Sequence, residues 1–176
     1  MLRQVLIIFF VLGWAVACAQ TSPKVLVATG KVVAAGAVSP GTWLCENGGL
    51  TGGSPPCGPT TTRVFIQSMS NKYVQQDVTG SAAAMVGGTN ITTVNGNFDA
   101  TYFGQMWGTF QWAVPDMGGR WEGSFTAVGD QMKGLVFNRA VGYGYGGKLE
   151  GLKLEFFQAS PGAGLTPIFV AVVTSK

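Results

Sequence analysis

The chain has 176 residues and a small positive charge, with 11 Lys or Arg against 8 Asp or Glu, and it contains no histidine. The absence of histidine excludes Ser-His-Asp and Cys-His catalysis and any metal centre built on imidazole ligands. The basic residues are spread singly, which argues against a nucleic-acid partner. Glycine, at 27 residues, has about twice its usual share, which favours turns and crowded strands over helices.

The first residues have the pattern of an export signal. A basic start precedes an apolar run over residues 5–16 and a group of small residues, so residues 1–19 predict a cleaved secretory signal that is too short for a stable membrane span. Cleavage after Ala19 removes Cys18. Cleavage before Cys18 follows the bacterial lipoprotein pattern, in which Cys18 carries lipid, residues 20–23 form a tether and the lipid is the sole membrane contact. The protein is then expected to be secreted, periplasmic or anchored to the outer membrane.

Either cleavage leaves Cys45 and Cys57 as the remaining unmodified thiols. The segment between them is rich in Gly and Pro, and no cationic neighbour lowers the pKa of either thiol for redox chemistry. In an oxidising compartment this pattern predicts a Cys45–Cys57 disulfide, which stabilises the fold by roughly 3 kcal/mol through the entropy of the unfolded chain.

From residue 24 onwards the hydrophobic pattern has a period of two, and no stretch of a dozen residues keeps the period of a helix. Short turns separate the segments and favour antiparallel pairing. We expect one all-β domain over residues 24–176, folded as a small antiparallel barrel of eight to nine strands. The segments with strand character cover residues 24–38, 63–69, 73–79, 89–94, 97–103, 105–114, 120–127, 132–143, 148–157 and 167–174, of which 89–94 and 97–103 become one strand if Asn95-Gly96 is a bulge.

Turn signals decide several of these boundaries. Residues 70–72 (Ser-Asn-Lys) are interpreted as a short turn, and residues 39–60 as a loop insertion around the cysteine pair. Asn95-Gly96 is a strong hairpin signal, and a bulge within one longer strand is its alternative.

Alternation within the strands predicts which side chains point into the barrel, and the inward set is aromatic and rich in glycine. A large side chain beside a glycine either fills a tapered interior or leaves a slot for an apolar ligand. Arg139 is added to the expected pocket because an inward guanidinium would bind a ligand carboxylate in bidentate geometry. A position on the surface is the alternative for this residue. Tyr143 and Tyr145 lie in the Gly-rich run and are expected at the rim of the barrel. The expected pocket residues are Phe110, Trp112, Phe125, Arg139, Tyr143, Tyr145, Leu154 and Phe156.

Three motifs in this region, WGTFQW at 107–112, GRWEGSFT at 119–126 and GYGYGGKLEGL at 142–152, resemble the allene oxide cyclase-like barrel proteins, which include exported bacterial members. The resemblance covers residues 61–158. It implies an eight-stranded antiparallel barrel of the lipocalin-like kind with an apolar cavity. It carries no catalytic residue to a numbered position of this chain, and fold analogy alone does not establish a reaction.

Other chemistry receives less support from the residues. Glu122 and Glu150 occupy equivalent positions in two similar segments and suggest the paired carboxylates of a glycoside hydrolase. Glu122, however, falls on the polar face of its strand. The Gly-Tyr run at 142–147 precedes no helix that would present its N-terminus to a phosphate. Asn90-Ile91-Thr92 is a glycosylation sequon, relevant in a eukaryotic source. We assign no catalytic residue, metal or cofactor.

The sequence therefore predicts an exported β-barrel that binds a small apolar or amphipathic molecule without catalysis. Two alternatives remain. One is an isomerase of the allene oxide cyclase type acting on an apolar substrate. The other is an envelope structural or adhesion module that uses exposed aromatic side chains such as Trp107.

Overall fold

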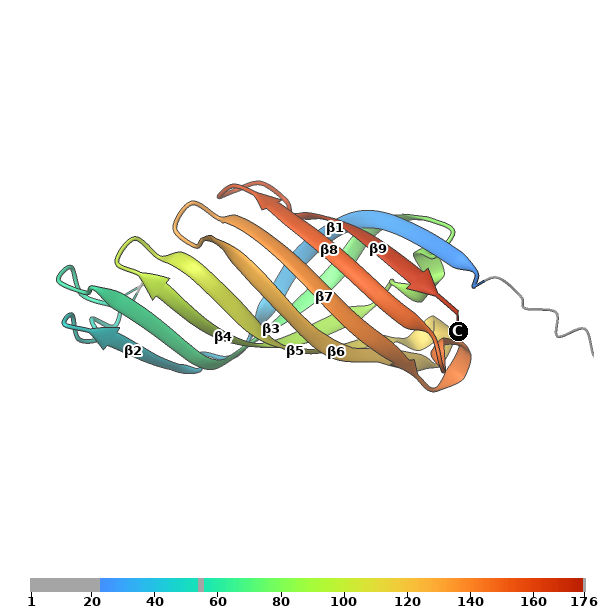
Figure 1. Ribbon diagram of the computed structural model, residues 1–176, viewed down its shortest axis with the longest axis horizontal. Helices are drawn as coiled ribbons and strands as arrows, with labels where there is room; N and C mark the ends of the chain where they lie inside the picture. Colours follow the sequence, from blue (N-terminus) through green and yellow to red (C-terminus); the bar gives the residue numbers. More distant parts are fainter. Residues whose placement is uncertain (1–22, 54–55, 176) are drawn as a thin grey trace, which may run out of the picture.

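The computed structural model describes residues 23–53 and 56–175, so the predicted signal and Cys18 lie outside the described residues. The described chain is almost entirely strand, and its steeply slanted strands form one elongated barrel (Figure 1). No helix among these residues is long and apolar enough to cross a membrane. The strands are β1 (Val25–Ser39), β2 (Thr42–Glu46), β3 (Arg63–Gly80), β4 (Thr89–Asp99), β5 (Phe103–Val114), β6 (Gly119–Asp130), β7 (Leu135–Tyr145), β8 (Lys153–Pro161) and β9 (Ile168–Thr174).

The sheet closes through β1, which pairs with both β9 and β3. From β3 to β9 each strand pairs antiparallel with the next, so eight strands form the closed barrel. The short strand β2 pairs only with the first part of β3, at residues where β1 no longer reaches it. The all-β barrel predicted from the sequence is confirmed, with β2 as one extra strand.

Two local predictions about the strands are wrong. Residues 70–72 do not turn, because they lie within β3 and pair on one side with β1 and on the other with β4. Asn95-Gly96 forms no hairpin either, and the alternative of one longer strand, β4, is confirmed. The irregularity lies in β3 instead, between Ile66 and Met69, where Ser68 has a φ of 54° and its N–H donates to Asn95 Oδ1 at 3.1 Å. Pairing on both edges of the strand has overridden the local turn preference.

Two further boundaries differ from the prediction. The expected loop 39–60 contains β2, whose Cys45 pairs with Val64 in β3. The strand expected at 148–157 begins only at Lys153, because residues before it form a short 3-10 turn, η3 (Gly147–Leu149). Cys45 and Cys57 form the predicted disulfide, with their Cα atoms 5.5 Å apart.

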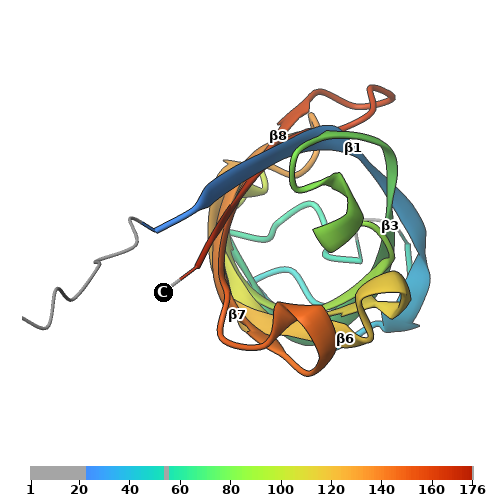
Figure 2. The same ribbon diagram turned by 90° about the vertical axis from the view of Figure 1, so that its right-hand side faces the viewer.

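One end of the barrel is closed. Three 3-10 turns gather there: η1 (Ala83–Met85), η2 (Pro115–Met117) and η3, and Figure 2 shows the segment that carries η1 lying across the mouth of the barrel. The indole N–H of Trp121 donates to the Met85 carbonyl oxygen at 2.7 Å. Val86 and Leu149 at this end are fully buried, so the end is well packed.

Cross-strand pairs of phenylalanine and glycine shape the interior. Phe110 pairs with Gly123, Phe125 with Gly108 and Phe169 with Gly30. A Cβ atom built on any of these three glycines would lie 2.8–3.0 Å from a ring atom of the phenylalanine. Each ring therefore lies over a glycine of the neighbouring strand, along the wall of the barrel, and less of it occupies the centre.

Candidate functional site: an uncharged cavity inside the barrel

A cavity of about 430 Å³ occupies the barrel interior beyond the closed end. Inward residues from seven of the eight barrel strands, β1 and β3 to β8, line it, and residues of the β6–β7 and β8–β9 loops border it at the end away from η1. Its volume lies within the range of pockets that bind small organic molecules. The barrel is thus a container that is sealed at one end and bordered by loops at the other.

Aromatic side chains form one part of the cavity wall. Trp112 and Phe156 meet edge to face, with ring centroids 5.4 Å apart, and Phe156 stacks on Phe169 at 5.0 Å. Phe110 and Phe125 line the wall on the two strands after β4. This arrangement offers an apolar molecule close contact with rigid rings.

Polar side chains form the neighbouring part of the wall, on β3 and β4, where Asn90 and Thr92 are register partners of Trp112 and Phe110. The register places Asn71 opposite Thr92 and Tyr73 opposite Asn90, and Gln75 extends the row along β3. Asn138 and Gln158, which are partners across β7 and β8, add a second polar pair. Together these groups provide both hydrogen-bond donors and acceptors.

Several of these polar atoms have no hydrogen-bond partner among the described protein atoms. Both amide atoms of Gln75 lack a partner although the residue is only 7% exposed, and so do Asn90 Oδ1 and Asn138 Oδ1. The indole N–H of Trp112, a residue 1% exposed, is likewise unpaired. Buried polar atoms without partners are rare in folded proteins because each carries a desolvation cost, so their concentration around one cavity is typical of a binding site.

No Asp, Glu, Lys or Arg is among the lining residues. Tyr73 is the one lining residue that titrates. Burial raises the pKa of its hydroxyl above the ordinary value, and this outweighs the opposing influence of the neighbouring Thr92 and Asn71 side chains. Tyr73 is therefore protonated at neutral pH and acts as a neutral hydrogen-bonding group.

The structure brings half of the expected pocket residues together. Phe110, Trp112, Phe125 and Phe156 line the cavity. Leu154 points inward and is fully buried, but it belongs to the packed interior and not to the cavity lining.

The other three expected pocket residues require a correction. Arg139, Tyr143 and Tyr145 all lie on the outer face of β7, because every second residue of that strand points away from the barrel. Arg139 stacks its guanidinium over the Phe157 ring at 5.8 Å and lies 3.6 Å from a Glu155 carboxylate oxygen. It cannot hold a ligand inside the barrel from that position.

The suggested carboxylate pair also has other partners. Glu122 Oε1 accepts a hydrogen bond from Arg120 Nε at 2.6 Å, and Glu150 Oε2 accepts one from the Gly146 N–H at 2.6 Å. Across residues 23–53 and 56–175 no three His, Cys, Asp or Glu side chains are grouped as metal ligands. These carboxylates therefore stabilise a strand and a turn.

The polar wall is the part of the site that the sequence interpretation missed. A turn at residues 70–72 would have broken the alternation that places Asn71, Tyr73 and Gln75 on one face. Interpreting residues 63–80 as one strand would have revealed the row. The sequon residue Asn90 belongs to the same wall, so its amide faces the barrel interior.

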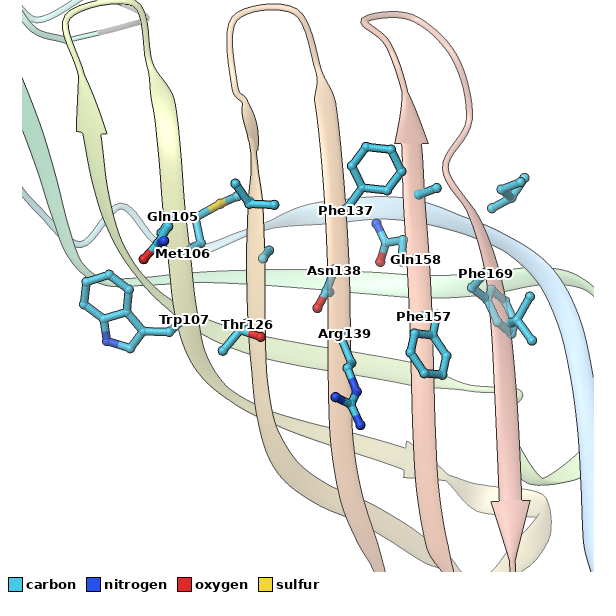
Figure 3. A pocket seen from close by; sticks show the side chains of 15 residues that line it. Gln105, Met106, Trp107, Thr126, Phe137, Asn138, Arg139, Phe157, Gln158 and Phe169 are labelled. Atoms are coloured by element: carbon cyan, nitrogen blue, oxygen red, sulfur yellow. The ribbon is translucent and has the colours of Figure 1, made fainter.

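The outer face of β5 to β9 carries an apolar groove (Figure 3). Trp107, Phe137 and Phe157 contribute exposed rings, with exposed fractions of 46%, 65% and 41%. Arg139 lies among them, so the outer face of the barrel is also unusually apolar.

Comparison with known proteins identifies no relative. The chain matches no family model, no curated protein and no solved structure. The resemblance to allene oxide cyclase-like proteins therefore remains a prediction.

Proposed function

We propose that this protein is an exported, non-catalytic binding protein that holds a small amphipathic molecule inside its barrel. The observation that carries the proposal is the cavity of about 430 Å³, which combines an aromatic wall with buried polar atoms that have no partner in the protein. Burying unpaired polar groups lowers stability, and a ligand that pairs with them compensates for this cost when it binds.

The phenylalanine–glycine pairs support the same function. A barrel of this size can fill its interior with side chains, but here the Phe110 and Phe125 rings lie against glycines of adjacent strands. A Cβ atom at Gly123 would meet both the Val141 carbonyl oxygen and, at 2.8 Å, the Phe110 ring, so a larger residue does not fit there without moving the strand or the ring. The glycine-rich composition thus keeps space open for a ligand.

Binding is favoured over catalysis by the same lining. The cavity offers amides, hydroxyls and an indole, but no carboxylate, ammonium or guanidinium group that would transfer a proton near neutral pH. Burial raises the pKa of Tyr73, so its hydroxyl stays protonated at neutral pH and does not serve as a base. An isomerase of the allene oxide cyclase type would have to rely on hydrogen bonding alone, so we keep it as the weaker alternative.

We propose export for two reasons. Residues 1–19 have the pattern of a secretory signal, and the Cys45–Cys57 disulfide suits an oxidising compartment. The two cleavage sites make different predictions. A Cys18→Ser variant loses membrane association if Cys18 carries lipid and is unchanged if cleavage follows Ala19.

The binding function is tested with an uncharged, environment-sensitive dye such as Nile red and with native mass spectrometry of the purified protein. We expect saturable dye binding and co-purifying small molecules. Ala140→Phe, which places a ring in the cavity, should abolish dye binding, whereas Val141→Phe, on the outer face of the same strand, should not. Thermal melts establish that both variants fold, and Ala127→Leu is a milder filling change. Unchanged binding in a folded Ala140→Phe variant contradicts the proposal.

The outer groove favours a second candidate, the envelope module that attaches through exposed aromatic residues. Replacing both Trp107 and Phe137 by Ser separates the two functions. An attachment module would be released from the cell envelope by this change. A binding protein of the kind proposed would keep its affinity for the dye.

A further inference from the structure

We infer that the ligand has an apolar body and an uncharged hydrogen-bonding head, such as an amide or an alcohol, and that the cavity discriminates against the carboxylate of the same chain length. This inference rests on the proposed binding function and specifies the class of ligand.

The cavity is unsuited to a buried charge. A carboxylate that leaves water must find a cation or several hydrogen-bond donors, because burying an unpaired charge costs several kcal/mol. The described cavity lining contains no cation. Arg139, the residue that could have served, lies outside the barrel beside Glu155.

The nearest candidate cation in the border loops is Lys133, between the lining residues Gln131 and Gly134. Its ammonium lies 2.9 Å from an Asp130 carboxylate oxygen, and its side chain is 73% exposed. Lys133 is therefore already paired with Asp130 and exposed at the rim, so it is not a buried cation of the cavity lining.

The unpaired polar atoms of the cavity lining include both hydrogen-bond donors and acceptors. The Gln75 amide leaves a donor and an acceptor free, Asn90 and Asn138 leave carbonyl oxygens free, and Trp112 leaves an N–H free. This mixture matches a head that both donates and accepts, as an amide or alcohol does. An ionised carboxylate accepts only, so it would leave the free carbonyl oxygens unpaired and repel them.

The cavity volume sets the size of the ligand. The volume of about 430 Å³ lies in the lower part of the range of pockets that bind small organic molecules. Decanamide and decanol, each with about a dozen non-hydrogen atoms, are of that size. Their chains would contact the aromatic wall formed by Phe110, Phe125 and Phe156.

The experiment measures competition of decanamide, decanol and decanoate with Nile red at pH 8, where decanoate is ionised. We expect decanamide and decanol to bind at least about tenfold more tightly than decanoate. A tenfold difference in affinity corresponds to about 1.4 kcal/mol, and burying an unpaired carboxylate costs more than that. Equal affinities, or tighter decanoate binding, would overturn the inference and leave the proposed function standing. If neither the dye nor any of the three molecules binds, both the proposed function and the inference are wrong.

A matched pair of variants locates the head of the ligand. Gln75→Met keeps the approximate shape of the side chain and removes its amide, and we expect it to weaken decanamide about tenfold while Nile red binding changes little. Gln111→Met makes the same change on the exposed face of β5 and should have no effect. Unchanged decanamide affinity in both Gln75→Met and Asn138→Leu would overturn the inference. A tenfold loss of decanoate affinity in a Lys133→Gln variant would also overturn the inference, because it would show that the rim binds a charged head.

Discussion

Two tryptophans that face each other across β5 and β6 show how differently the two parts of the barrel are built. Trp112 and Trp121 are register partners and both are fully buried. The Trp121 indole N–H donates to the Met85 carbonyl oxygen and holds η1 across the closed end. The Trp112 N–H has no partner in the protein and lines the cavity. The first indole completes the packed core, whereas the second is available to a ligand.

The largest expected effect tests the closed end. Trp121→Ala removes a fully buried indole and should lower the free energy of unfolding by about 3–5 kcal/mol, because a cavity forms and η1 loses its hydrogen bond. Urea denaturation of the variant and the wild type measures this. A loss below about 1 kcal/mol would mean that η1 does not depend on Trp121.

The disulfide should have a smaller and more local effect. Replacing Cys45 and Cys57 by Ser removes the cross-link that ties the segment after β2 back to it, and we expect a loss of up to about 3 kcal/mol. Because β2 pairs only with the start of β3, dye binding in the cavity should survive. Thermal melts with and without reductant check the stability, and lost dye binding in a folded double variant would contradict the separation of β2 from the cavity.

Parallel Trp→Phe changes test the comparison most directly. Trp121→Phe leaves the Met85 carbonyl without its donor and should cost about 1–3 kcal/mol of unfolding free energy beyond the loss of volume. Trp112→Phe removes an N–H that has no protein partner, so its cost should be smaller and its effect on ligand affinity larger. Urea denaturation and dye titration of both variants give the two readouts. Equal costs in stability would break the comparison.

The smallest expected effect is a dependence of local stability on pH, at the end of the barrel that is bordered by the β6–β7 and β8–β9 loops. The Asp130 side chain accepts from Lys133, and this hydrogen bond together with backbone N–H groups lowers the pKa of Asp130 below its ordinary value. A carboxyl whose folded pKa is lowered stabilises the fold above its ordinary pKa and loses that contribution as the pH falls through the folded value. The Asp99 pKa is lowered as well, chiefly by the Thr101 side chain.

Hydrogen exchange below about pH 4, corrected for intrinsic rates, measures this effect. The loops after β4 and β6 should lose protection before the segment around η1 does. An Asp130→Asn variant should show a weaker dependence on pH in the β6–β7 loop. Earlier loss of protection around η1 would contradict the expected order.

Much of the barrel was predictable from the second half of the chain. The strands around Trp112, Trp121 and Phe156 alternate cleanly, and the structure confirms their inward faces. The first half misled because polar residues in β3 resemble a turn and Asn95-Gly96 resembles a hairpin. Both segments are held straight by hydrogen bonds to strands on each side, which a local pattern does not reveal.

The amino-acid sequence by itself determined the class of fold, the disulfide and the glycine–aromatic alternation, because a period of two and residue size act locally. Only the tertiary structure decided which residues form the site. Barrel closure brings the polar rows of β3 and β4 into one lumen with Asn138 of β7, and strand register turns Arg139 outward. Whether the interior is charged or neutral follows from that register, since a shift of one residue exchanges the inner and outer faces of a strand.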